Sequence, residues 1–172
     1  MKEWFSLLGR EWQLGAAEVA SLSPDATIVV TQPILRGEGT QPDWERCGSV
    51  VRSGEVLHHE PVQTAKELAE VIVRHIPAKD SKFVFGLSAP SMASPRYNNL
   101  CKAIKQAGVA ADRKLRIIRS QTGTVLNTGE ISHNAIMRKG AEFMIWEEQG
   151  FTYIGRVTWE QDVAAYAARD QA

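Results

Sequence analysis

The sequence predicts a mixed fold, in which a small α+β unit of roughly sixty residues precedes an α/β layer. The first unit is indicated by the order strand, helix, strand, loop and strand. After residue 64 the order is helix, strand, helix, strand, short helix, strand and strand, which is typical of an α/β layer with a partly parallel, mixed sheet. The 172 residues, of which 44% are hydrophobic and 23% charged, suffice for one compact domain or two small ones.

The first part of the chain contains short apolar segments separated by turn residues. Residues 3–8 have the apolar character of a strand, and residues 13–22 are predicted to form a short helix that ends before Ser23-Pro24-Asp25. Residues 27–31 are rich in β-branched side chains and predict a strand. Two glycines and two prolines predict a loop over residues 33–42. Further strand candidates, interrupted by Gly54, lie at 50–51 and 55–57.

A linker is predicted at Glu60–Gln63, and Thr64 then begins the clearest helix of the chain. Thr64 and Glu67 have the spacing of a capping box, and Pro77 ends the helical pattern. A strand over 82–87 and a loop over 88–95 follow. The remaining expected elements are a helix at 96–106, a strand at 115–118, a helical turn within 129–137, a hairpin of 143–146 with 151–158, and a final helix at 159–169.

The middle of the chain is strongly basic, although the net charge of the whole chain is zero. Residues 81–140 contain 10 lysines and arginines against two acidic residues, a net charge of +8, while residues 1–80 and residues 141–172 each carry −4. Such a concentration of positive charge attracts polyanions, above all nucleic-acid phosphates, but a solvated basic face is the alternative. Within the helix at 96–106, the spacing lets Lys102 and Lys105 face solvent together.

Familiar catalytic and metal-binding patterns do not account for this chain. The stretch Gly37–Pro42 begins like a dinucleotide loop but has proline at the third glycine position. His58 and His59 follow the strand candidate at 55–57, and adjacent side chains in a strand point to opposite faces, so a shared metal ion is not expected. Cys47 and Cys101 lie far apart without a CxxC pattern and are interpreted as small apolar residues. No apolar run is long enough to span a bilayer, and the apolar stretch near the N-terminus is too short for a signal peptide. A cytoplasmic protein is therefore expected.

Several stretches together resemble one protein family. They are Phe5-Ser6-Leu7-Leu8-Gly9-Arg10 with Ala17-Glu18-Val19, Arg46-Cys47-Gly48-Ser49-Val50-Val51 before Glu55-Val56-Leu57, Leu126-Asn127-Thr128 before Asn134, Lys139-Gly140-Ala141-Glu142-Phe143, and Tyr153-Ile154-Gly155-Arg156-Val157 with Gln161-Asp162, Tyr166 and Arg169-Asp170. This combination looks like the N-terminal half of the THUMP-containing tRNA guanine-N2 methyltransferases.

The resemblance implies three regions: a ferredoxin-like domain at 1–60, a THUMP-like RNA-binding domain at 61–158 and a connecting helix at 159–172. It also implies that methylation takes place in a separate Rossmann-like domain. An Asn/Asp-Pro-Pro-aromatic motif would be expected there, and this chain has no Pro-Pro pair. S-adenosylmethionine is therefore expected only in a partner or downstream domain, with tRNA and that methyltransferase domain or subunit as the partners.

The expected RNA contacts combine the charge pattern with this resemblance. We expect phosphate contacts from basic residues and base or sugar contacts from a few polar residues. The phosphate contacts are Arg96, Lys102, Lys105, Arg116, Arg119, Arg138 and Lys139, and the base or sugar contacts are Asn127, His133 and Asn134.

Three functions stay open on the sequence alone. The leading hypothesis is a tRNA-binding module that holds the acceptor stem and the 3′ CCA end. The second is a subunit of a split tRNA guanine-N2 methyltransferase that is active only with its partner. The third is a protein-interaction module without RNA binding, in which the acidic flanks are docking surfaces. No residue is assigned a catalytic role, and the oligomeric state is left open.

Overall fold

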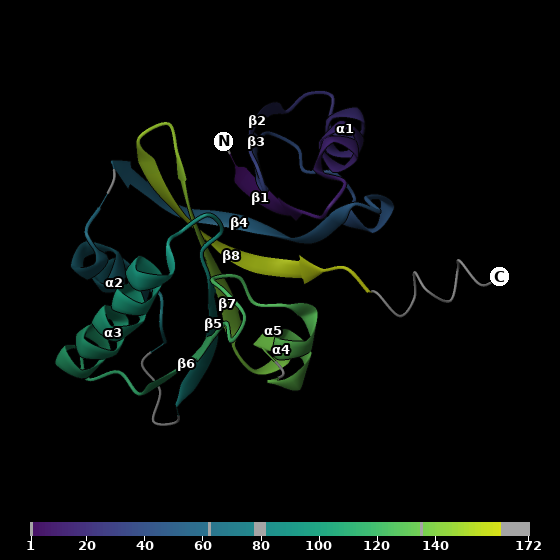
Figure 1. Cartoon of the computed structure of the whole chain (residues 1–172). Coiled ribbons are helices and arrows are strands. Elements are labelled where there is room, and N and C mark those ends of the chain that lie inside the picture. The colour runs from purple at the N-terminus through teal and green to yellow at the C-terminus, as the bar shows by residue number, and fades with distance from the viewer. Residues whose placement is uncertain (1, 62, 78–81, 135, 163–172) are drawn as a thin grey trace. The chain divides into compact units, whose positions relative to one another are not determined.

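A computed structural model describes residues 2–61, 63–77, 82–134 and 136–162 (Figure 1). The fold is mixed α/β with mixed parallel and antiparallel strands, as predicted. The chain divides into two compact units, one formed by residues 1–55 together with those from Val157 onward, the other by Val56–Arg156.

The first unit is an antiparallel sheet with one main helix. Its strands are β1 (Glu3–Leu8), β2 (Thr27–Thr31), β3 (Ile34–Glu38) and the first part of β4 (Val50–Pro61), in the order β2-β3-β1-β4. The helix α1 (Trp12–Leu22) and the short 3-10 helix η1 (Trp44–Arg46) complete the unit. Its core gathers Trp4, Leu8, Val19, Leu35, Trp44, Cys47 and Val50.

Strand β3 lies where a loop was predicted, so that expectation was wrong. The glycine within it, Gly37, has a structural reason in the neighbouring strand. A Cβ atom at position 37 would come within 2.3 Å of the Trp4 ring. Gly37 therefore makes room for a core tryptophan, and it does not mark a turn. Likewise β4 is one continuous strand that includes Gly54, where two short strands were expected.

The predicted final helix also begins too early. Trp159 and Glu160 form the end of strand β8 (Phe151–Glu160), and residues 163–169 lie outside the described part of the chain. The Trp159 ring stacks on Trp44 with 6.4 Å between ring centroids, and its indole N–H donates to Glu45 Oε1 at 2.7 Å. These contacts within the first unit hold Trp159 in extended conformation.

The second unit contains a partly parallel sheet. Its strands, in the order β8-β7-β5-β6, include β5 (Phe83–Ser88), β6 (Leu115–Arg119) and β7 (Ala141–Glu148). β5 pairs in parallel with both β6 and β7, whereas β7 and β8 are antiparallel. Because β5 and β6 run in the same direction, the loops that follow Ser88 and Arg119 start at the same edge of the sheet.

Two helices, α2 (Ala65–Arg74) and α3 (Ser94–Ala110), share the main core of this unit with the sheet. The predicted capping box of α2 is confirmed, since the Thr64 hydroxyl accepts the Glu67 N–H at 3.2 Å and Glu67 Oε1 accepts the Thr64 N–H at 3.2 Å. α3 is longer than expected. It passes through Gly108, where a Cβ atom would lie 2.3 Å from the Leu115 side chain. The glycine therefore leaves space for Leu115 of β6 to pack against the helix.

Two short helices, α4 (Thr128–His133) and α5 (Ile136–Lys139), occupy the region where a helical turn was predicted. They bury Ile131 and Ile136 together with Ile118 of β6 and Leu126. Val84 packs against this cluster, whereas its neighbours Phe83 and Phe85 belong to the core shared with α2 and α3. Because strand neighbours point to opposite faces, α4 and α5 cover the face of the sheet opposite to α2 and α3. Among the described residues, no helix is both long and apolar enough to cross a membrane.

Candidate nucleic-acid interface

A hollow of about 500 Å³ lies beside β6 and the start of α4. It is lined by basic and amide side chains from two separate segments, together with strand and helix residues: Arg116, Ile117, Ile118, Arg119, Gln121, Asn127, Gly129, Glu130 and Asn134. Four of these, Arg116, Arg119, Asn127 and Asn134, are residues that the sequence predicted as RNA contacts. The fold thus brings two of the predicted phosphate contacts and two of the predicted base or sugar contacts to one place.

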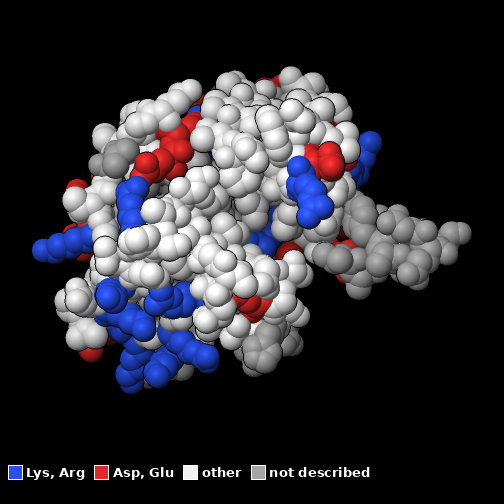
Figure 2. All heavy atoms as spheres, viewed as in Figure 1, with Lys and Arg blue, Asp and Glu red and all other residues white. Residues whose placement is uncertain are grey.

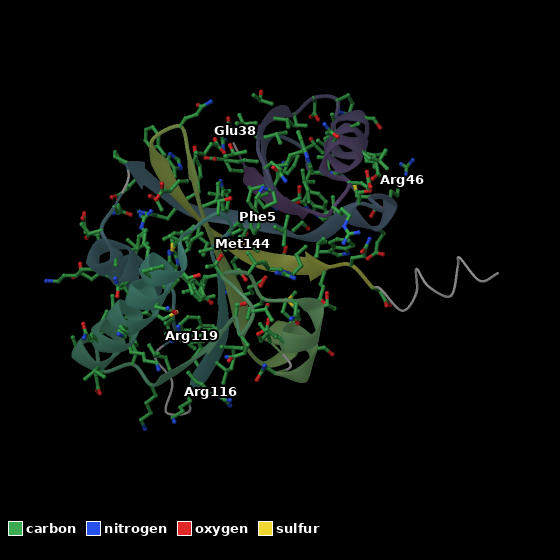
Figure 3. The ribbon with its side chains drawn as sticks, in the orientation of Figure 1. Phe5, Glu38, Arg46, Arg116, Arg119 and Met144 are labelled. Carbon is green, nitrogen blue, oxygen red and sulfur yellow. The ribbon has the colours of Figure 1, made fainter. Side chains whose placement is uncertain are left out.

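The two arginines, labelled in Figure 3, lie on opposite faces of β6, the strand at one end of the sheet order, and both line the hollow. Arg116 is exposed and shares a face with Ile118, which packs toward α4 and α5. Arg119 is half-buried on the α3 side, and its guanidinium donates a hydrogen bond to Asn98 Oδ1. Arg116 is therefore the more accessible cation, whereas Arg119 is oriented by α3.

The loop after β6 is held by buried hydrogen bonds. The hydroxyl of Tyr97, on α3, accepts the Ser120 N–H at 3.0 Å and donates to the Leu87 carbonyl at 2.7 Å. The Ser120 hydroxyl in turn accepts the N–H of Gly123 at 3.0 Å. Burial is the main cause that raises the pKa of the Tyr97 phenol to about 12, so it stays protonated and keeps its donor. These bonds hold the loop from which Gln121 lines the hollow.

The other polar wall is the N-terminal end of α4. Asn127 Oδ1 accepts the Glu130 N–H at 2.8 Å, and Glu130 Oε1 accepts the Asn127 N–H at 3.0 Å, which makes a second capping box. The side-chain amide of Asn134 donates to the Glu130 carbonyl at 2.8 Å. Asn127 and Asn134 are thus set into the hollow by the helix that they flank.

The remaining predicted contacts do not line the hollow. Lys102 and Lys105 are both exposed on α3, whose buried side carries Leu100 and Ile104. In Figure 2 lysine and arginine side chains gather over the area where Figure 1 shows α3 and β6. Surface cations of this kind can follow a phosphate backbone without forming a pocket.

Arg96 has a structural partner that its sequence position did not reveal. Its guanidinium forms an ion pair with Glu147 of β7 and donates to the Gln63 carbonyl at 3.4 Å. A phosphate contact from Arg96 would have to compete with Glu147. The side chains of His133, Arg138 and Lys139, which were also predicted as RNA contacts, lie outside those that the structure describes.

Two polar side chains of the hollow, those of Gln121 and Glu130, were not predicted from the sequence. Glu130 could have been found, because Asn127 and Glu130 have the same spacing as the capping box recognised at Thr64 and Glu67. Gln121 carried no comparable signal. It lines the hollow only because the chain turns directly after β6.

The hollow contains hydrogen-bond donors, acceptors and positive charge, which are means of binding. Within the part of the chain that the structure describes, no group of three His, Cys, Asp or Glu side chains is placed to hold a metal ion. His59 instead stacks on Tyr153 with ring centroids 5.2 Å apart, and His58 Nε2 lies 3.3 Å from Glu60 Oε1. The arginine and amide side chains of the hollow are groups that can bind a polar, anionic ligand.

Comparisons with known proteins give similarity at the level of the fold. No protein-family model matches the chain, and no curated protein sequence matches it. Among solved structures, TrmN from Thermus thermophilus superimposes with a TM-score of 0.55 at 11% identity, over 92% of this chain and 46% of that one. PH1313 from Pyrococcus horikoshii gives a TM-score of 0.49 at 12% identity, over 91% of this chain and 54% of that one.

A 4-thiouridine synthetase solved in complex with RNA and ATP gives a TM-score of 0.47 at 5% identity, over 91% of this chain and 41% of the synthetase. This chain thus spans about half the length of the structures that it resembles. The superposition on TrmN supports the THUMP-type α/β fold that the sequence resemblance implied.

Proposed function

We propose that this chain is a tRNA-binding module that presents tRNA to an S-adenosylmethionine-dependent methyltransferase domain lying elsewhere, in the same polypeptide or in a partner subunit. The observation that carries the proposal is the hollow beside β6, which is lined by Arg116, Arg119, Asn127 and Asn134. The fold similarity to TrmN and the net charge of +8 over residues 81–140 support the same function.

Binding would combine two kinds of contact. Arg116 and the exposed Lys102 and Lys105 would contact phosphates, which makes affinity fall steeply with salt. The amide groups of Asn127, Asn134 and Gln121 would hydrogen-bond to bases or sugars of an unpaired segment. The unpaired segment that we propose is the 3′ CCA end, with the adjoining acceptor stem along the basic surface.

As part of this proposal, methyl transfer takes place in the other domain. The Ser88 hydroxyl, at the end of β5, is buried and donates to Glu142 Oε2 at 3.1 Å. The Ser120 hydroxyl, just after β6, accepts N–H groups of its own loop. Both hydroxyls are engaged by the protein, so we derive no step through S-adenosylmethionine in this chain. The free, buried cysteines Cys47 and Cys101 are compatible with the cytoplasmic setting that we propose.

The test is a titration of labelled tRNA, measured by fluorescence anisotropy over a range of salt concentrations. Arg116→Glu should weaken binding at least about tenfold, because it removes a charge-assisted contact and adds repulsion. The slope of the logarithm of affinity against the logarithm of salt concentration should also become shallower by about one, because one phosphate contact is lost. Arg46→Glu, which reverses an exposed arginine in the first unit, is the matched control and should change affinity little.

Removing the last three nucleotides of the tRNA distinguishes general RNA binding from recognition of the 3′ CCA end. Weaker binding to the shortened tRNA supports the assignment of the 3′ end. Equal binding to both forms contradicts that assignment but leaves RNA binding intact. The absence of salt-sensitive binding to either form contradicts the whole function.

A further inference from the structure

Glu130 is an acidic residue in the wall of a basic hollow, and its hydrogen bonds connect the polar parts of that wall. Its Oε2 accepts the Gln121 N–H at 2.9 Å, and its Oε1 accepts the Asn127 N–H at 3.0 Å. Its own N–H donates to Asn127 Oδ1 at 2.8 Å, and its carbonyl accepts from the Asn134 side chain at 2.8 Å. One residue thus contacts three others that line the hollow.

We infer that Glu130 is a positioning residue that clamps the loop after β6 to the start of α4, and so sets the RNA-binding shape of the hollow. The inference rests on the proposed RNA-binding function. The loop and the helix are separate segments, and the carboxylate bridges them by accepting one backbone N–H from each. A carboxylate suits this task because it offers two acceptor oxygens and no donor.

Glutamine at this position would keep the size of the side chain but not its function. Its amide has one acceptor oxygen, so one of the two N–H groups would face an NH₂ group. The Gln121 segment or the Asn127 segment would then lose its hydrogen bond and its fixed position. The amide groups that we assign to base and sugar contacts would move with it.

Electrostatics alone predicts the opposite effect of this substitution. A carboxylate beside Arg116 and Arg119 repels phosphate, so its removal should strengthen binding to a polyanion, most of all at low salt. If Glu130 instead holds the loop after β6 to the start of α4, Glu130→Gln should weaken binding although the repulsion is lost. The two roles of Glu130 therefore differ in the sign of the effect.

The experiment compares Glu130→Gln with Glu67→Gln in tRNA titrations over a range of salt concentrations. Glu67 is the matched control, because it occupies the same position of the capping box of α2 and does not line the hollow. We expect Glu130→Gln to weaken binding about tenfold, corresponding to one lost charge-assisted hydrogen bond. The salt slope should not become shallower, since the number of phosphate contacts stays the same. Glu67→Gln should bind within about twofold of the unsubstituted chain.

Amide hydrogen exchange without RNA gives a readout that does not depend on the proposed function. Exchange at Gln121 and Asn127 should become faster in Glu130→Gln and stay unchanged in Glu67→Gln. Unchanged protection of both amides in Glu130→Gln overturns the clamp, whether or not the chain binds RNA. Affinity that is equal or higher in Glu130→Gln, while the unsubstituted chain binds tRNA, also overturns the inference. Failure of the unsubstituted chain to bind any tRNA counts against the proposed function instead.

Discussion

The hydroxyl of Tyr97 on α3 accepts the backbone N–H of Ser120 at 3.0 Å and so joins the helix to the loop beside the hollow. The same hydroxyl donates to the Leu87 carbonyl at 2.7 Å. Tyr97 is only 1% exposed, so both bonds lie out of water. A single phenol therefore connects α3, the end of β5 and the loop that follows β6.

Replacing Tyr97 with phenylalanine should lower the free energy of unfolding by about 1–3 kcal/mol, because a buried N–H and a buried carbonyl each lose a partner. Urea denaturation followed by circular dichroism measures this change. Hydrogen exchange at the Ser120 amide should become faster in the same variant. A stability and an exchange rate equal to those of the unsubstituted chain would show that the phenol is not a structural link.

The raised pKa of Tyr97 makes a second prediction, about alkaline stability. Burial raises the pKa of the folded phenol to about 12 from an ordinary value of about 10, so the folded state holds this proton more tightly than the unfolded state. The stabilisation is complete below pH 10 and is lost as the pH rises from 10 to 12. Its size is on the order of 3 kcal/mol.

Denaturation between pH 9 and pH 12 checks this, with Tyr97→Phe as the control that lacks the titrating group. The difference in stability between the two proteins should shrink over that range. A constant difference would contradict the assignment of the pKa.

Gly37→Ala should destabilise the first unit by about 1–3 kcal/mol, as expected for overpacking. The new methyl group would meet the Trp4 ring at 2.3 Å, and the ring is fully buried and cannot swing away into solvent. The fluorescence of the tryptophans during denaturation measures the change. Gly123→Ala is the matched control, since a Cβ atom there meets nothing within 4 Å, and it should change stability by less than about 0.5 kcal/mol.

The double substitution of Lys102 and Lys105 by glutamate tests the exposed side of α3. Both side chains are exposed, so stability should change little, while tRNA affinity at low salt should fall at least about tenfold. The matched control reverses Arg10 and Arg46, two exposed arginines of the first unit. If affinity falls equally in both double variants, the effect is one of total charge, and α3 is not part of the interface. If the chain is a protein-interaction module without RNA binding, neither double variant should change the signal measured with tRNA.

Local patterns predicted the main helices and most strands well. The helix after Thr64 could be read from its capping box and its apolar spacing, because both depend on residues within two turns of each other. Strand β3 could not be read in this way. Its glycine and the flanking prolines resemble a loop, and the reason for Gly37 is a tryptophan in another strand.

The candidate site was predicted in part. Arg116 and Arg119 followed from the concentration of charge, and Asn127 and Asn134 were expected as base or sugar contacts; all four line the hollow. No role was predicted for Glu130, which is one of the two acidic residues between positions 81 and 140. Its hydrogen bond to Gln121 depends on how the chain turns after β6, which residue types alone do not reveal.

By itself the sequence determined the class of the fold, the capping of α2 and the position of the basic segment, because these depend on residue type and on near neighbours along the chain. Only the tertiary structure decided which of the charges are available. Arg96 is paired with Glu147, 51 residues away, whereas Arg116 is exposed beside the hollow. The physical reason is that ion pairing and exposure are set by contacts between residues that are distant in the chain, and these exist only once the sheet has formed.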